Sequence, residues 1–281
     1  MQQSKQAAFA AAIIVATLTG ALVASTSSAQ SNNQGGDAAV KEIEKYRQAL
    51  GDGNPAELWE ARGEDIWKQK RGPNRQSLEQ CDIGLGPGKV KGAYTVLPRY
   101  FDDTDKVEDL ESRLVTCMVT LQGFSYEEAR KNPFGSPERK SDIEALVAYV
   151  TAESRGMKMN VAGKHPKEKQ AYAIGKVMFF HRCGPHDFGC VTCHGADNQR
   201  IRLQDLPNLT NKEQAQRAYT SWPAYRVSQG ELRSFQWRLF DCFRQQRFPE
   251  LEFTSQGSIA LTTYLAKNAN GGVLSAPSIK R

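Results

Sequence analysis

Residues 190–194 read Cys-Val-Thr-Cys-His, and this short pattern restricts what the chain can fold into more than any other feature. Two thiols three positions apart on a helical turn can form thioethers to the two vinyl groups of one haem, and the histidine that follows lies under the iron. A zinc knuckle would need two further ligands at comparable spacing, and none follows nearby. Half of a redox-active cysteine pair and chance are the other readings. The pattern predicts one covalently bound haem c, attached through Cys190 and Cys193 with His194 as proximal iron ligand.

The residues after His194 limit the choice of a distal ligand. Electron-carrying cytochromes c usually supply a downstream methionine or histidine, but neither residue type follows His194 in this sequence. Cys242 is the strong downstream candidate. Arginines lie near it in sequence, and guanidinium groups favour a thiolate, which is both the better iron ligand and the nucleophile. These arginines are Arg233, Arg238, Arg244 and Arg247.

The residues alone leave several readings of Cys242 open. It can be the distal ligand, an ordinary buried thiol or half of a disulfide, and the iron can also be five-coordinate. The upstream Met178 and His186 are further candidate ligands.

The N-terminus predicts export. Lys5 precedes an apolar run over residues 7–23, and Ser27-Ser28-Ala29 places small residues where a signal peptidase reads. We expect residues 1–29 to be a cleaved signal peptide, the alternative being a retained anchor. No later segment is long enough to insert into a membrane, so we expect the mature protein in the periplasm. The net charge of +6 is moderate, and without a basic stripe it predicts no nucleic-acid partner.

Apolar spacing predicts a mainly α fold. Helices are expected at 41–48, 55–69, 107–121, 141–152, 167–180 and 258–267. The segments 141–156 and 256–271 resemble each other, because each has an apolar helical face, a Tyr three residues after a Leu, and a glycine stop. Glycine and proline at 156–166 mark a boundary. We therefore expect two cytochrome c-like helical domains, at 30–160 and 161–281.

The chain resembles the SoxA family, the haem subunits of the SoxAX cytochromes of bacterial thiosulfate oxidation. The resemblance runs through most of the mature chain. It is carried by the haem motif, by Trp-Pro-Ala-Tyr-Arg at 222–226, by Arg-Leu-Phe-Asp-Cys at 238–242 and by the stretch 247–249. The haem motif is generic, whereas an arginine four residues before a downstream cysteine is far more specific.

The resemblance implies an activity and its residues. Cys242 would be the distal iron ligand and the nucleophile that carries a persulfide, and Arg238 would bind thiosulfate, a compact dianion that suits a guanidinium fork. The alternative is that Arg238 is a solvated surface residue or binds a haem propionate. The implied function is an L-cysteine S-thiosulfotransferase, with a SoxX-like cytochrome as subunit and a SoxYZ-like carrier protein as acceptor. The rival functions are a plain periplasmic electron-transfer cytochrome and a haem-based sensor or storage module.

The first domain departs from the two-haem members of the family. Where those carry a second haem motif, this chain has Cys81 without a second cysteine or a histidine. Cys117 matches the family's axial cysteine for the lost haem. The resemblance therefore implies a first domain without haem and a Cys81–Cys117 disulfide in an oxidising compartment, the alternative being two unpaired thiols. Cys183 is left over, either free or paired with a partner chain. Arg226, Arg244 and Arg247 are left to line the anion path or to serve the propionates.

Overall fold

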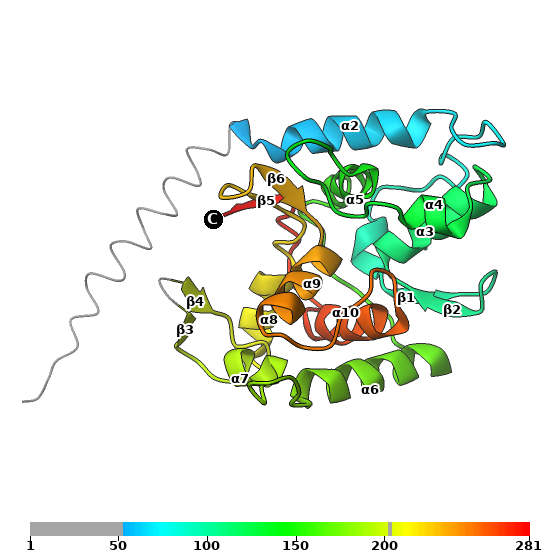
Figure 1. Ribbon diagram of the computed structural model, residues 1–281. Helices are drawn as coiled ribbons and strands as arrows, with labels where there is room; N and C mark the ends of the chain where they lie inside the picture. Colours follow the sequence, from blue (N-terminus) through cyan, green and yellow to red (C-terminus); the bar gives the residue numbers. More distant parts are fainter. Residues whose placement is uncertain (1–52, 202–203) are drawn as a thin grey trace, which may run out of the picture. The chain divides into compact units, whose positions relative to one another are not determined.

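The computed structural model describes residues 53–201 and 204–281, and helices carry most of their secondary structure (Figure 1). This confirms the predicted mainly α class. The helices are α2 (Ala56–Lys68), η2 (Ala93–Val96, a 3-10 turn), α3 (Leu110–Thr120), α4 (Tyr126–Arg130), α5 (Asp142–Ala152), α6 (Pro166–Phe180), α7 (Cys190–His194), α8 (Lys212–Tyr219), α9 (Phe235–Gln245) and α10 (Gln256–Asn268). The expected signal peptide and the expected helix at 41–48 lie outside the described residues.

The strands are short and form three small sheets. β1 (Arg99–Phe101) pairs antiparallel with β2 (Lys106–Glu108), and β3 (Gln199–Ile201) pairs antiparallel with β4 (Gln204–Leu206). In the third sheet, β5 (Ala224–Arg226) lies between antiparallel β6 (Glu231–Arg233) and parallel β7 (Ser278–Lys280). Within the described part of the chain, none of the helices combines the length and the apolar character that crossing a bilayer requires.

Five of the predicted helices form within three residues of their expected bounds. Ser141 begins α5 by accepting a hydrogen bond from the backbone N–H of Glu144 at 3.1 Å. The expected helix at 107–121 starts late, at Leu110, because residues 106–108 pair with β1 instead. Asp109 then caps α3 through the backbone N–H of Ser112 at 3.0 Å. α4, α8 and α9 were not expected from the sequence.

Two helix pairs are built in the same way. α2 packs against α5, and α6 packs against α10 (Figure 1). A Cβ placed on Gly63 of α2 would lie 2.8 Å from the Cβ of Tyr149, and one on Gly175 of α6 would lie 2.9 Å from the Cβ of Tyr264. Any side chain at either glycine would push the helices apart. The two tyrosines are those of the paired segments 141–156 and 256–271, so the sequence similarity reflects a shared helix crossing.

The elements between these helices repeat as well. Three elements of the second half begin 125 residues after their counterparts, from 99 to 224 (β1, β5), from 106 to 231 (β2, β6) and from 110 to 235 (α3, α9). The same shift carries Cys117 onto Cys242 and Arg113 onto Arg238. The fold therefore contains two copies of one hairpin-helix unit, each with a cysteine four residues after an arginine. The boundary near residue 160 between them stays a prediction.

In the first half the cysteine of α3 is used structurally. Cys117 forms a disulfide with Cys81, with a Cα–Cα distance of 5.7 Å, and both residues are buried. This is the pairing that the family resemblance implies. The bond ties α3 to the loop that follows α2, where the second half has its haem motif.

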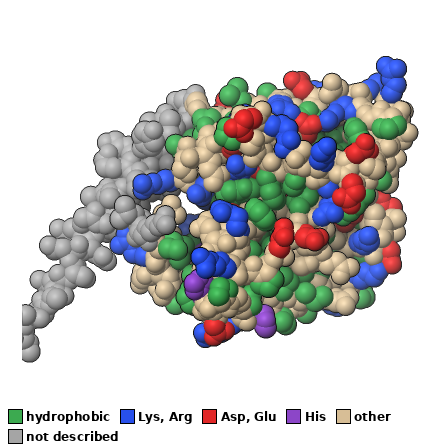
Figure 2. All heavy atoms as spheres, viewed as in Figure 1, with side chains coloured by type: hydrophobic (Ala, Val, Ile, Leu, Met, Phe, Trp, Pro, Cys, Tyr) green, Lys and Arg blue, Asp and Glu red, His purple; other side chains and the backbone are tan. Residues whose placement is uncertain are grey.

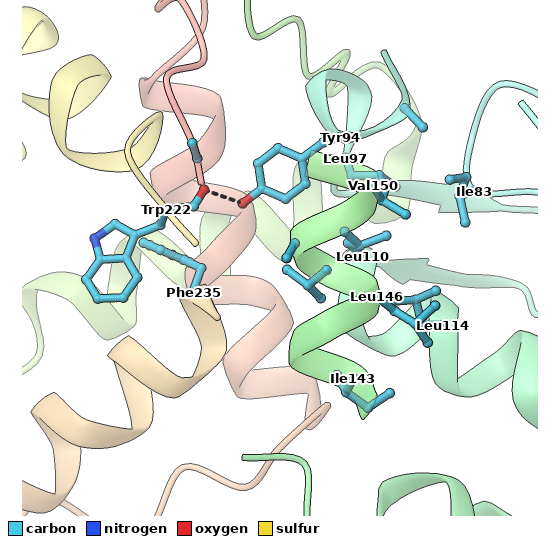
Figure 3. Close-up of a cluster of buried hydrophobic side chains, with 14 of the residues drawn as sticks. Ile83, Tyr94, Leu97, Leu110, Leu114, Ile143, Leu146, Val150, Trp222 and Phe235 are labelled. Atoms are coloured by element: carbon cyan, nitrogen blue, oxygen red, sulfur yellow. Dashed lines mark hydrogen bonds between the residues drawn. The ribbon is translucent and has the colours of Figure 1, made fainter. Parts of the chain in front are cut away.

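The two halves share one continuous core. Tyr94 of η2 donates a hydrogen bond from its hydroxyl to the backbone carbonyl of Trp222 at 3.3 Å, beside the apolar side chains Leu146 and Val150 of α5 (Figure 3). The described residues accordingly all belong to one compact unit. The second half is therefore held in place by the first, even though only the second carries the haem motif.

Buried carboxyl groups lie where the halves meet. The side chain of Gln236 donates to Asp109 at 2.6 Å, and its backbone N–H donates to Glu111 at 3.2 Å. Burial and then the neighbouring Asp109 raise the pKa of Glu111 to about 8. Glu111 is therefore protonated in the folded protein at neutral pH.

Removing the disulfide should weaken the fold without disturbing the haem motif. Cys81→Ala/Cys117→Ala releases a loop with a sequence separation of 36, which predicts a loss of about 4 kcal/mol from the free energy of unfolding. Urea unfolding of the haem-loaded protein measures this loss, and its visible absorption should stay as in wild type. Cys183→Ala is the control, because Cys183 is a free, half-buried thiol. Equal stability of the double variant and wild type would contradict the structural role of the bond.

Glu111 should make the fold less stable as the pH rises. Its pKa is raised in the folded state, so its contribution is full below the ordinary value of 4.5 and is lost as the pH rises towards 8. Glu111→Gln keeps a neutral side chain at every pH. It should reduce the fall in Tm between pH 5 and pH 8 by about 2–4 °C for each kcal/mol that Glu111 contributes to the pH dependence of the free energy of unfolding. Thermal unfolding followed by circular dichroism measures this. The exposed Glu127→Gln should retain the wild-type slope, and the same slope in both variants would refute the assignment.

Candidate functional site

The haem-motif helix presents a histidine in a state fit for metal binding. α7 begins after Gly189, and the imidazole Nδ1 of His194 lies 2.8 Å from the backbone carbonyl of Pro207. A carbonyl only accepts, so Nδ1 carries the proton and Nε2 keeps a free lone pair. Burial lowers the pKa of His194, and although the hydrogen bond to Pro207 opposes it, the charge of Arg238 lowers the pKa further and favours the neutral ring. His194 thus meets the requirements of a proximal ligand.

α9 brings the predicted nucleophile to the same place. Arg238 and Cys242 are one helical turn apart and share a face of α9. Burial and then the neighbouring Cys242 raise the pKa of Cys190 to about 12, and Cys193 in turn acts on Cys242. The fold therefore places the Cys242 thiol near those of Cys190 and Cys193, although Cys242 follows them by 52 and 49 residues in sequence. All three are free and half-buried.

A second guanidinium faces this cluster. Arg226, at the end of β5, interacts electrostatically with Arg238, Asp241 and Cys242. Its Nε is buried and has no hydrogen-bond partner among the described residues. Burial first, and then the like charge of Arg238, lower its pKa. The charges of two arginines thus act on one thiol, and one of the two retains an unused buried donor. The sequence left the role of Arg226 open, although it belongs to the Trp-Pro-Ala-Tyr-Arg segment.

The pKa of Cys242 differs from the sequence-based expectation. The arginines were expected to favour the thiolate, yet the pKa of Cys242 is raised, because burial outweighs the opposing effects of Arg238 and Arg226. Asp241 and Cys193 raise it further. The protein alone therefore favours the thiol form, and a thiolate here needs an additional positive charge such as a metal ion.

The other arginines near Cys242 in sequence have different roles. Arg233 is buried and donates to the backbone carbonyl of Gly135 at 2.8 Å, so it links the halves. Arg244 is mostly exposed and pairs with Asp241 at 2.8 Å. Arg247 is exposed. Of the four arginines that the sequence singled out, Arg238 is the one whose charge acts on Cys242.

The first half provides an internal comparison for Arg238. Its counterpart Arg113 is 5% exposed, pairs with Asp103 at 2.8 Å and Glu108 at 3.1 Å, and lies over the ring of Phe101 at 4.0 Å. Arg238 is 28% exposed and has one long contact, 3.5 Å to Asp241. The same position of the repeat is therefore saturated by protein partners in one half and left available for a ligand in the other.

Of the remaining candidate residues, His186 and Met178 have their contacts outside this cluster, whereas Cys183 acts electrostatically on Cys190. The His186 ring packs against Phe188 at 5.8 Å in the loop before α7, and Met178 lies against Gly257 of α10. Cys183 is free in the same loop as His186. Burial and then Asp187 raise the pKa of Cys183.

These residues fit a haem c. Cys190 and Cys193 would form the thioethers, His194 would ligate the iron through Nε2, and the Cys242 sulfur is the candidate distal ligand. The free donor of Arg226 and the half-exposed Arg238 leave positive charge for an anion or a propionate beside it.

Known proteins resemble the chain over most of its length. A family model described as SoxA/TsdA, cytochrome c domain, matches residues 62–159, which are in the half without the haem motif. The "L-cysteine S-thiosulfotransferase subunit SoxA" of Hydrogenophilus thermoluteolus is 54% identical over 87% of this chain and 89% of its own length. A protein of the same name from Hydrogenobacter thermophilus is 32% identical over 81% of this chain and 82% of its own.

A solved structure shares the fold. The crystal structure of SoxXA from P. pantotrophus matches with a TM-score of 0.68 and 24% identity, over 84% of each chain. The first half is thus a cytochrome c domain by its sequence match, even though its own cysteines form a disulfide.

Proposed function

The chain belongs to the SoxA family, and we propose that it is the haem-carrying subunit of an L-cysteine S-thiosulfotransferase. In this role it couples thiosulfate oxidatively to a cysteine of a SoxYZ-like carrier protein in periplasmic sulfur oxidation. The relatives' names supply the reaction class. The observation that carries the proposal is that the charges of Arg238 and Arg226 both act on the Cys242 thiol, on which the haem-attachment residue Cys193 acts as well.

The charges of the site match the substrate. Thiosulfate is a dianion, and two guanidinium groups supply two positive charges and planar sets of donors for its oxygens. The unused Nε of Arg226 gains a partner when the anion binds. Asp241 accepts from Arg244 and Gln245 and lies 3.5 Å from Arg238, so it orients Arg238 without neutralising it fully. The substrate is thereby held with its sulfane sulfur towards Cys242.

The reaction balances as an oxidation followed by an exchange. The sulfane sulfur of thiosulfate forms an S–S bond with the sulfur carried by Cys242, and two electrons are released. A carrier thiolate then attacks the sulfane sulfur, forms a new S–S bond and releases the Cys242 sulfur as an anion. The net change is thiosulfate plus carrier thiolate giving a carrier thiosulfonate and two electrons. Haem c, when bound, supplies the one-electron redox chemistry by which these electrons leave singly.

The proposed setting follows from the same residues. One haem is proposed, in the second half, which Cys190 and Cys193 would hold covalently and whose iron His194 and Cys242 would bind. The Cys81–Cys117 disulfide supports a mature chain in an oxidising compartment, the periplasm, after removal of residues 1–29. A SoxX-like cytochrome subunit is proposed as the electron acceptor and heterodimer partner. The carrier protein would reach Cys242 with a flexible arm.

Removing either guanidinium should weaken use of the substrate. Arg238→Gln and Arg226→Gln each remove charge-assisted hydrogen bonds worth about 1.5–3 kcal/mol, which predicts a fall in kcat/KM for thiosulfate of about 10- to 100-fold. Steady-state assays of the complex with its carrier measure this. The exposed Arg247→Gln is the control and should stay within about twofold of wild type. Equal losses in all three variants would show a general effect of charge rather than a two-arginine site.

Removing the thiol should separate a thiosulfotransferase from an electron carrier. Cys242→Ala should lower turnover by on the order of 10³-fold or more, the scale of loss when a covalent nucleophile is removed. Reduction of the same variant by dithionite, and its reoxidation by a small acceptor, should persist. Cys183→Ala should retain turnover. Thiosulfate-dependent activity in Cys242→Ala would contradict the proposal and leave the alternative, a plain periplasmic electron-transfer cytochrome.

A further inference from the structure

A charged cavity of about 360 Å³ lies in the first half, which has no haem motif. It is surrounded by α2, the loop after α2, α3, α4 and the start of α5. In Figure 2, Lys and Arg side chains lie on the upper part of the visible face, where α2 and α5 run in Figure 1. We call it the α5 cavity. The charged residues that line it are Arg62, Arg71, Lys131, Arg139 and Lys140, together with Glu128 and Asp142.

The carboxylates leave the α5 cavity with an excess of positive charge. Arg62 and Arg71 both pair with the single carboxylate of Asp142, Arg71 at 2.6 Å. Lys140 pairs with Glu231 of β6. Five cations therefore face three carboxylates, two of the cavity itself and that of Glu231, which leaves two positive charges in excess. Such an excess at one concave surface attracts anions.

Two of the arginines have donors that the protein does not use. The Nη1 of Arg71 is buried and has no hydrogen-bond partner among the described residues. The guanidinium of Arg139 is exposed, and residues 53–201 and 204–281 give it neither an ion pair nor a hydrogen bond. A buried donor without an acceptor costs free energy, which a ligand with acceptor atoms recovers. The cavity is therefore suited to a ligand that brings both oxygen acceptors and negative charge.

The start of α5 adds backbone donors to the same cavity. Asp142 and Ile143, the first two residues of this 11-residue helix, line it. The backbone N–H groups of a first helical turn have no acceptor within the helix. Ser141 takes the N–H of Glu144, one position further on. The positive end of the helix dipole thus faces the cavity beside the guanidinium groups, and this favours an anion.

The haem-motif half lacks this charge at the equivalent place. The two glycine contacts align α2 with α6 at a shift of 112 residues, from 63 to 175. Arg62 then corresponds to Ile174, and Arg71 to Cys183. The short antiparallel bridges support the second pair, since residues 71 and 76 form one and residues 183 and 188 form the other, at the same shift. The fold therefore does not require guanidinium groups here.

We propose that the α5 cavity is a second anion site, which binds a small divalent oxoanion such as sulfate or thiosulfate. Two charges on the ligand match the two positive charges in excess, and the guanidinium forks suit its oxygens. Cys117, which adjoins the lining residue Met118, is in the disulfide, so the anion is bound here without being oxidised. Its binding ties α2 and α5 together and stabilises the folded chain. The site needs neither haem nor a free thiol and is thus independent of the proposed function.

Equilibrium dialysis of the haem-loaded chain against radiolabelled sulfate, at constant ionic strength, tests this site. Arg238→Gln is the background, because it removes a guanidinium of the proposed thiosulfate site. This background should bind one sulfate saturably. Addition of Arg139→Gln should weaken the affinity about tenfold or more. Folding is not at risk, because Arg139 is exposed and unpaired in the described part of the chain. Arg217→Gln is the matched control, an exposed arginine of α8, and should bind as the background does.

Further arms decide the remaining cases. Arg71→Gln, added to the background, should weaken sulfate binding as Arg139→Gln does and should remove the rise in Tm that sulfate causes. Unlabelled sulfate and thiosulfate should both displace the label, and their order shows which of the two binds more tightly. Absence of saturable binding, affinity that Arg139→Gln leaves unchanged, an equal loss in Arg217→Gln, or equal displacement by chloride would each overturn the proposal.

Discussion

The close approach of two helices at a glycine organises this protein, and it occurs twice. At Gly63 and at Gly175 a helix backbone lies against a tyrosine-bearing helix with no room for a side chain. Each crossing fixes one end of a hairpin-helix unit. In the second half, α6 also contacts α7 and α10 also contacts α9, and the cysteines of α7 and α9, about 50 positions apart in sequence, act electrostatically on one another. The haem motif alone would not define that site without α9.

The two copies of the unit have opposite uses. In the first, the cysteine is in a disulfide and the arginine is enclosed by Asp103, Glu108 and the ring of Phe101. In the second, the cysteine is a free thiol and Arg238 has one long contact. The same backbone therefore gives a stabilising half and a reactive half. Because the halves share a core, the energy that the first contributes also holds the second in place.

The sequence predicted best those features that depend on residue spacing, which are the apolar helices and the repeated segment. The helices with clear apolar periodicity were predicted, and the paired segments 141–156 and 256–271 correspond to a real duplication. α9 was missed, because its site-facing positions are polar and its apolar pattern is interrupted by Arg238 and Asp241. Arg226 was not assigned to the site, since its proximity depends on the pairing of β5. The effect of the guanidinium groups on Cys242 has the expected sign, since Arg238 and Arg226 lower its pKa, but burial outweighs it, and burial cannot be judged from neighbouring residues in sequence.

The central claim is that sulfur chemistry takes place on Cys242, and peptide mass mapping tests it most directly. The haem-loaded protein is purified without reductant, incubated with thiosulfate and digested, and the peptide that contains Cys242 is weighed. The account predicts a mass increase on this peptide equal to one sulfur atom or to a bound thiosulfate, removed by a thiol reductant, with Cys183 unmodified. An unmodified Cys242 in protein that turns over thiosulfate would contradict it.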